Sequence, residues 1–232
     1  MGLIIGLGNT KRSVTSPTPV SPTGYVKDGL VLHYSALNNT GAGHDNNTNV
    51  WKDLIGNNDG DIVNAQWKDS SLSFNGTNAL VKFKGDITPS FTIHAFVKRD
   101  AAQGQHARIW AEEPYPSLYL HTQGLRYALY GQGVDLPFAP DKTMPADEWI
   151  VLSVSYEVGS NSVLLYENGL HIGRLAVTRN PQSTVSAFLG GRGSGAARFF
   201  KGEYRTFLIY NRALTTEEIQ TNFEADTKTQ FP

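Results

Sequence analysis

The sequence contains no cysteine in its 232 residues. Disulfide bonds, thiolate metal sites and cysteine nucleophiles are therefore excluded together, and the fold has to be stabilised by packing. An excess of one charge is also missing, because 20 basic and 21 acidic side chains leave a formal net charge of −1. Nucleic acid is consequently not expected as a partner, since binding a phosphate backbone requires a basic surface.

Long apolar runs are missing as well. A membrane span needs about 18 apolar residues in succession, and the apolar patch at residues 3–7 is far shorter. The basic residues Lys11 and Arg12 follow this patch, whereas in a secretory signal the basic residues come first. The sequence therefore predicts neither a membrane span nor a signal peptide.

What the chain does contain is the pattern of β structure. Hydrophobic residues make up 40% of the chain and aromatic residues 11%, which is enough to fill a two-sheet core. Residues 71–85 and 90–100 alternate apolar and polar side chains, as half-buried strands do. Asn168-Gly169 is typical of a hairpin turn, and Thr215 or Thr216 can cap a short helix. We predict an all-β antiparallel two-sheet sandwich with one short C-terminal helix.

The first 24 residues differ in composition from the rest of the chain. Residues 13–23 contain three prolines among several Ser and Thr residues, a composition that favours an extended spacer. We therefore divide the chain into an extended N-terminal arm and linker at residues 1–24 and one domain at residues 25–232.

Several separated segments of the domain resemble the laminin-G-like or pentraxin-like branch of the concanavalin A-like jelly rolls. The segments that carry this resemblance are residues 28–36, 51–62, 71–83, 91–98, 163–169 and 208–219. The resemblance covers about residues 25–226 and implies a jelly-roll sandwich whose rim loops bind glycans, proteins or calcium. It does not fix a function, because the same scaffold also carries glycan hydrolases and structural domains.

Catalytic carboxylates of the kind found in glycan hydrolases on this scaffold are not apparent. They would project from one strand in a pattern such as E-x-D-x-E, so that alternate residues share a face. Glu112-Glu113 and Asp147-Glu148 are adjacent pairs instead. No G-x-S-x-G motif marks a nucleophilic serine either. From the sequence alone we expect a chain that is not an enzyme.

Aromatic residues in the middle of the chain are candidates for carbohydrate binding, because sugars stack on flat rings beside amide and guanidinium groups. The candidate ligand-binding residues are Trp110, Tyr115, Tyr119, Gln123, Arg126 and Tyr130. The alternative is that these aromatic side chains form part of the core, as most aromatic residues in a sandwich do.

Calcium is a second ligand to consider, since hard cations are bound by carboxylates and carbonyl groups from loops. Asp45, Asp59 and Asp61 are candidate calcium ligands in two segments rich in Asn, Asp and Gly. The same residue types are required by turns. We expect no cofactor other than this possible calcium ion.

An apolar tip, a Pro/Ser/Thr spacer and a lectin-like domain resemble the architecture of virion surface proteins of tailed bacteriophages. The resemblance implies that Leu3, Ile4, Ile5 and Leu7 dock on a capsid or other virion protein, and that several copies assemble as a homo-oligomer. The chain would then be made in the bacterial cytoplasm and displayed on the exterior of the capsid or tail.

The first hypothesis is therefore a non-enzymatic capsid decoration or head fibre protein that binds cell-surface or mucosal glycans. The alternatives are a bacterial glycan-binding or adhesion module and a divergent glycan hydrolase.

Overall fold

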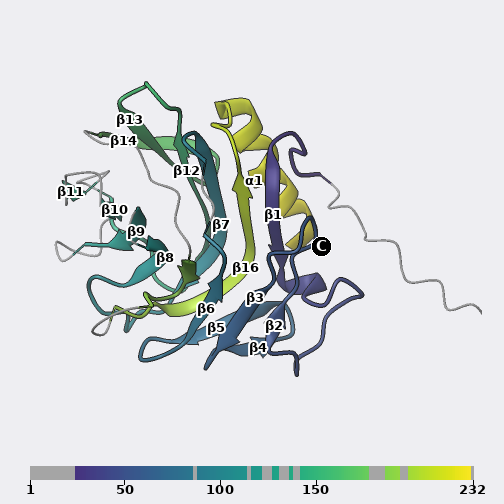
Figure 1. The fold of residues 1–232 in the computed structure, drawn as a ribbon. Coiled ribbons are helices and arrows are strands. Elements are labelled where there is room, and N and C mark those ends of the chain that lie inside the picture. The colour runs from purple at the N-terminus through teal and green to yellow at the C-terminus, as the bar shows by residue number, and fades with distance from the viewer. Residues whose placement is uncertain are drawn as a thin grey trace, which may run out of the picture.

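The structure is a computed structural model of the 232-residue chain. It describes residues 24–85, 88–113, 116–121, 127–130, 136–137, 142–177, 186–193 and 198–230. Two antiparallel sheets face each other across one core, and a single α-helix lies outside them (Figure 1). This arrangement confirms the predicted all-β sandwich with a C-terminal helix.

The first sheet is built around two long central strands, β7 and β16. Its order is β14 (Leu170–Ala176), β13 (Ser162–Glu167), β12 (Trp149–Tyr156), β7 (Phe91–Arg99), β16 (Lys201–Tyr210), β5 (Ser71–Asn75) and β4 (Gln66–Lys68). The strand β1 (Leu30–Ser35) pairs with the C-terminal half of β16, while β5 pairs with its N-terminal half. A short 3₁₀ helix, η1 (Ala36–Asn38), follows β1.

The second sheet forms the other layer. Its order is β11 (Leu136–Pro137), β10 (Tyr127–Tyr130), β9 (Ser117–Leu120), β8 (Arg108–Glu113), β15 (Ser186–Leu189), β6 (Leu80–Phe83), β3 (Gly60–Val63) and β2 (Val50–Trp51). Large apolar side chains from both sheets meet between the layers, including Trp51, Trp110, Phe74 and Phe207.

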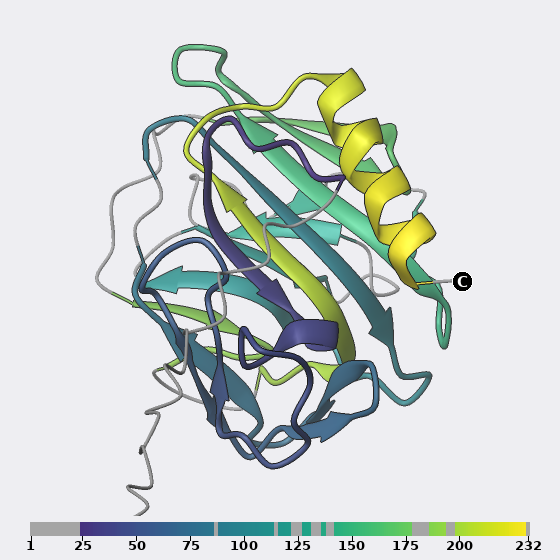
Figure 2. The same ribbon diagram turned by 90° about the vertical axis from the view of Figure 1, so that its right-hand side faces the viewer.

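The helix α1 (Thr216–Gln230) covers the outer face of the first sheet (Figure 2). It begins with the predicted cap, because the Glu218 amide donates to the Thr215 hydroxyl at 3.3 Å and the Glu218 carboxylate accepts from the Thr215 amide at 2.9 Å. A second apolar cluster, which includes Tyr25, Leu208 and Ile219, fills the space between helix and sheet.

The alternating pattern of β7 does not correspond to one buried and one exposed face. Phe91, Ile93, Ala95 and Val97 face the core as the alternation predicts. The residues on the opposite face are also buried, since Thr92, His94 and Phe96 are each at most 1% exposed. The prediction of a half-buried strand is therefore wrong for β7, because Asp226 of α1 and Tyr25 cover His94, while Trp149 and Arg205 pack against Phe96.

The hairpin between β13 and β14 has the turn that its sequence predicts. Asn168 and Gly169 both have positive φ, 51° and 78°, as a two-residue hairpin turn requires. A side chain at position 169 would also collide with Gln220 of α1. In the described part of the chain, no helix is long and apolar enough to cross a membrane.

A matched pair of leucines tests the core. Leu165 on β13 is fully buried between the sheets, whereas Leu170 on β14 is 69% exposed. We expect Leu165→Ala to lower the free energy of unfolding by about 2–5 kcal/mol and Leu170→Ala to change it by less than about 0.5 kcal/mol. Urea denaturation of both variants measures this difference, and equal losses would contradict the layer assignment.

Candidate functional site

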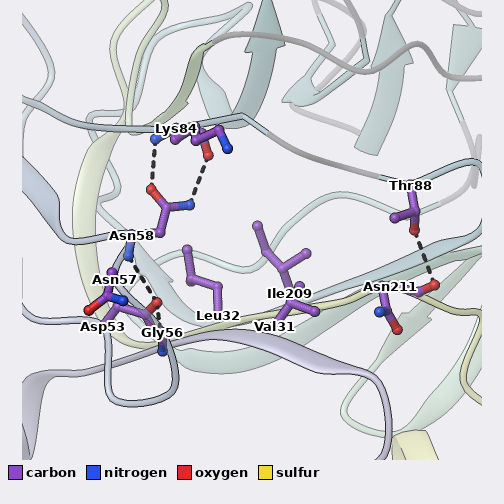
Figure 3. Close-up of a pocket in the computed structure, with 10 residues that line it drawn as sticks. All are labelled: Val31, Leu32, Asp53, Gly56, Asn57, Asn58, Lys84, Thr88, Ile209 and Asn211. Atoms are coloured by element: carbon purple, nitrogen blue, oxygen red, sulfur yellow. Dashed lines mark hydrogen bonds between the residues drawn. The ribbon is translucent and has the colours of Figure 1, made fainter.

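A cavity of about 420 Å³ opens at the rim of the sandwich, where the edge of the first sheet meets loops that leave the second sheet. Strands β1 and β16 supply Val31, Leu32 and Ile209, and residues 53–58, Lys84 and Thr88 form the opposite wall. Figure 3 shows these three apolar side chains lying between two polar groups, one around Asn58 and one at Asn211. We call this cavity the rim pocket.

The loop at residues 53–58 is organised by one buried carboxylate. The oxygens of Asp53 accept four backbone N–H groups, from His33 and Ile55 at 3.1 Å each, Gly56 at 3.1 Å and Asn58 at 3.2 Å. Asp53 is 3% exposed, and hydrogen bonds of this kind compensate a buried carboxylate for the loss of water. The loop is therefore held in one shape and attached to β1.

Asn58 joins this loop to the next one. Its side-chain oxygen accepts from the Lys84 amide and its side-chain nitrogen donates to the Lys84 carbonyl, both at 2.9 Å. The hydroxyl of the buried Tyr34 donates to the Asn58 carbonyl at 2.5 Å. Burial, and then the nearby Asp53, Asp59 and Asp61, raise the pKa of Tyr34, so the phenol stays a proton donor.

The other end of the rim pocket is formed where β7 begins and β16 ends. The hydroxyl of Thr88 donates to the Asn211 carbonyl at 3.1 Å, and the Asn211 amide donates to the Gly29 carbonyl at 2.8 Å. The side chains of Asn57 and Asn211 are both exposed. They supply amide donors and acceptors at opposite ends of an apolar floor, an arrangement common in small-molecule sites.

The comparison with known families adds an identification to this geometry. Residues 68–220 match the model of the concanavalin A-like lectin/glucanases superfamily. The chain belongs to this superfamily. The match confirms the concanavalin A-like jelly roll that the sequence predicts. No curated protein sequence is significantly similar to the chain.

Three solved structures illustrate the likeness within the superfamily. A sialidase from Trypanosoma rangeli in complex with sialic acid matches with a TM-score of 0.68 and 20% identity over 91% of this chain and 36% of the sialidase chain. Domain 4 of AbnA, a GH43 extracellular arabinanase from Geobacillus stearothermophilus, in complex with arabinotriose, matches with a TM-score of 0.56 and 21% identity over 82% of this chain and 96% of that domain. A heptameric SAP-like pentraxin from Limulus polyphemus matches with a TM-score of 0.51 and 16% identity over 64% and 78% of the two chains.

These neighbours correct one prediction. The expectation that the chain is not an enzyme is contradicted, because a sialidase and a domain of an arabinanase are among the structures most like it. A relationship to glycan hydrolases must therefore be included among the functions considered for this chain. The chain spans about a third of the length of the sialidase chains, and at these identities the likeness shows a shared fold.

Two of the predicted sugar-stacking residues are buried in this structure. Trp110 is 0% exposed and lies in the core, because a register irregularity between Arg108 and Trp110 turns both Ile109 and Trp110 inward. Tyr119 is 1% exposed, with the Arg108 guanidinium 4.2 Å from its ring centre. Neither ring is open to a ligand, so neither serves as an exposed stacking platform here.

The other predicted contact residues lie outside what the structure describes. Tyr115, Gln123 and Arg126 are in segments that it does not describe, and only the backbone of Tyr130, in β10, is described. The proposed docking residues Leu3, Ile4, Ile5 and Leu7 also lie outside the described residues.

The three calcium candidates do not come together as a site. Asp45 accepts from the backbone and side chain of Asn47, and Asp59 pairs with Lys52 at 2.9 Å. Asp61 lies on β3 directly opposite Lys82. Among the residues that the structure describes, no group of three or more His, Asp or Glu side chains could hold a metal ion. These carboxylates fit turns and ion pairs better than a calcium site.

A second polar cluster lies beneath α1 and was not predicted. His94 on β7 contacts the Ser153 hydroxyl at 2.8 Å and the Asp226 carboxylate at 2.7 Å, through its two ring nitrogens. This order of groups resembles a serine–histidine–aspartate triad. All three residues are at most 1% exposed, so a substrate cannot reach Ser153 in this structure. The cluster ties the helix to the sheet.

Neither cluster has a local sequence motif. The rim pocket combines residues from four separate segments, and His94 and Asp226 are 132 positions apart. The segment at residues 56–61 did carry a signal, since its Asn and Asp residues pointed to a turn or an oxygen-rich site. Nothing in this segment indicated that Asn57 and Asn58 lie across a pocket from β1 and β16.

Replacing Asp53 by asparagine tests the organisation of the loop. Asp53→Asn puts an amide nitrogen where one oxygen accepts two backbone N–H groups, so those donors stay unsatisfied. We expect the free energy of unfolding to fall by about 1–3 kcal/mol, with shifted NMR amide signals for residues 54–58. Asp61→Asn, at an exposed position on β3, is the matched control. An unchanged loop in Asp53→Asn would refute the role assigned to this carboxylate.

Proposed function

We propose that the domain is a carbohydrate-recognition domain that binds a glycan in the rim pocket. The observation that carries the proposal is an apolar floor between exposed amides at its two ends; Val31 contributes an exposed side chain to this floor, and Leu32 and Ile209 contribute largely buried ones. Sugars present the same combination, since their C–H faces are apolar and their hydroxyl groups donate and accept hydrogen bonds.

The pocket is suited to binding without large rearrangement. Asp53 and Asn58 fix the wall at residues 53–58 through hydrogen bonds to the backbone. A binding site that is already ordered loses less conformational freedom when the ligand arrives. The volume of about 420 Å³ also lies within the range of about 300–1,000 Å³ that is usual for small-ligand pockets.

Two neighbours support carbohydrate as the ligand class. The arabinanase domain was solved in complex with arabinotriose, and the sialidase in complex with sialic acid. The proposal holds equally for a chain that acts alone and for one that works within a longer glycan-active protein. Calcium is not required by the proposal, because the pocket walls are held by hydrogen bonds.

A glycan array with the full chain, followed by calorimetry on the glycans that bind, tests this function. Asn57→Ala and Asn211→Ala each remove one amide from the pocket, and we expect each to weaken binding by about 3- to 10-fold, as loss of one hydrogen bond does. Asn46→Ala removes an exposed amide that does not line the pocket and should leave affinity unchanged. Unaltered binding in both pocket variants would reject the rim pocket as the site.

We further propose, from the sequence alone, that residues 1–24 attach the domain to a virion. The apolar residues Leu3, Ile4, Ile5 and Leu7 would dock on a capsid or other virion protein, and several copies would make the attachment durable. A homo-oligomer and a location on the virion exterior belong to this proposal.

Deleting residues 1–12 tests the attachment. The shortened chain should remain folded by circular dichroism but no longer co-sediment with particles, because each buried apolar side chain contributes about 1.5–3 kcal/mol at most and all four are lost. Co-sedimentation of the shortened chain at the level of the full chain would refute a docking role for this arm.

A further inference from the structure

His33 on β1 has a buried imidazole ring that makes no hydrogen bond to the residues that the structure describes. It is 3% exposed, and neither of its ring nitrogens is hydrogen-bonded in the described structure. Buried polar groups are almost always hydrogen-bonded, so such an exception calls for an explanation. A neutral imidazole can be tolerated there, but an imidazolium would carry an uncompensated charge into the interior.

Three elements present titratable groups to this ring. Tyr25, from the segment before β1, lies edge-on with ring centres 5.3 Å apart. Asp226 of α1 accepts from the Tyr25 hydroxyl at 2.6 Å and contacts His94 of β7 at 2.7 Å. The Asp226 carboxylate is thus already bound by two other side chains, those of Tyr25 and His94. Burial lowers the pKa of His33 to about 4; the charge of Asp226 opposes this shift and His94 reinforces it.

The backbone of the same residue holds the loop of the rim pocket. The His33 amide donates to the Asp53 carboxylate at 3.1 Å, and the Leu54 amide donates to the His33 carbonyl at 2.9 Å. Asp53 in turn holds Ile55, Gly56 and Asn58. The side chain of His33 therefore faces the helix while its backbone attaches the pocket wall to β1.

We propose that His33 makes the rim pocket acid-sensitive: protonation of its imidazole displaces β1, detaches the loop at residues 53–58 and releases the bound ligand. The strand can move more easily than the centre of the sheet, because among the described strands it pairs only with β16 and its register shifts between Leu30 and Leu32. The release of a glycan rests on the proposed function, whereas the movement of the loop does not.

The direction of the effect follows from proton linkage. His33 binds a proton at its ordinary pKa of 6.5 when the strand is displaced, but only near pH 4 when it is packed. Acid therefore favours the displaced form, and the packed form is fully favoured above pH 6.5. Between pH 6.5 and 4 the ratio of packed to displaced molecules falls by about tenfold for each pH unit.

NMR titration of the full chain from pH 7.5 to 4 tests this coupling. In the unsubstituted protein, the amide signals of Leu54, Gly56 and Asn58 should change with the same midpoint as the ring signal of His33. In His33→Phe, which keeps a ring beside Tyr25 but cannot take up a proton, the loop signals should keep their pH 7.5 positions. His171→Phe replaces an exposed histidine on β14 and should retain the transition.

Two results would overturn the inference: a loop transition that persists in His33→Phe, or a loop midpoint that differs from that of the His33 ring. The comparison of the two midpoints tests the coupling even if His33→Phe does not fold. With a glycan identified on the array, the dissociation constant should rise below the midpoint of the loop transition, by up to about tenfold for each pH unit, and this increase should vanish in His33→Phe. If no glycan binds at pH 7.5, the proposed function fails while the loop titration still tests the coupling.

Discussion

The rim pocket depends on the carboxylate of Asp53. One side chain accepts backbone N–H groups from β1 and from three positions of its own loop, so it fixes both the shape of the loop and its distance from the strand. The side chain of Asn58 then fixes the backbone of Lys84 on the same wall of the pocket. The exposed amides of Asn57 and Asn211 then lie at defined positions over an apolar floor. Preorganisation of this kind is what a small polar ligand requires.

Burial of the centre of the first sheet beneath α1 is the second constraint. The polar row beneath α1 consists of groups that cannot reach water, so Tyr25, His94, Ser153 and Asp226 satisfy one another. His33 lies beside this row and takes no part in its hydrogen bonds. In the described part of the chain, the polar row beneath the helix is thus hydrogen-bonded, whereas the ring of His33 on the edge strand is not, and the backbone of His33 carries the loop of the pocket. This arrangement connects the helix side of the molecule with the proposed binding site.

Local patterns in the sequence were enough to predict the layers. Alternation placed Phe91, Ile93, Ala95 and Val97 in the core, and the dipeptide at 168–169 forms the predicted turn. The patterns failed where distant segments meet. The burial of Phe96 depends on what covers the outer face of β7. The inward position of Trp110 depends on a register irregularity that cannot be predicted from the residue types around it. The rim pocket could not be predicted for the same reason, since its walls come from segments up to about 180 residues apart.

The fold alone leaves the activity of the whole protein open, because this scaffold serves both glycan-binding and glycan-cleaving proteins. We propose a narrower function, in which a glycan binds in the rim pocket. The most direct measurement is an NMR titration of the full chain with a glycan selected on the array. The largest shifts are predicted for the amides of residues 56–58 and for Asn211. Shifts confined to the second sheet around Tyr119, or absent from the loop at residues 53–58, would contradict the claim.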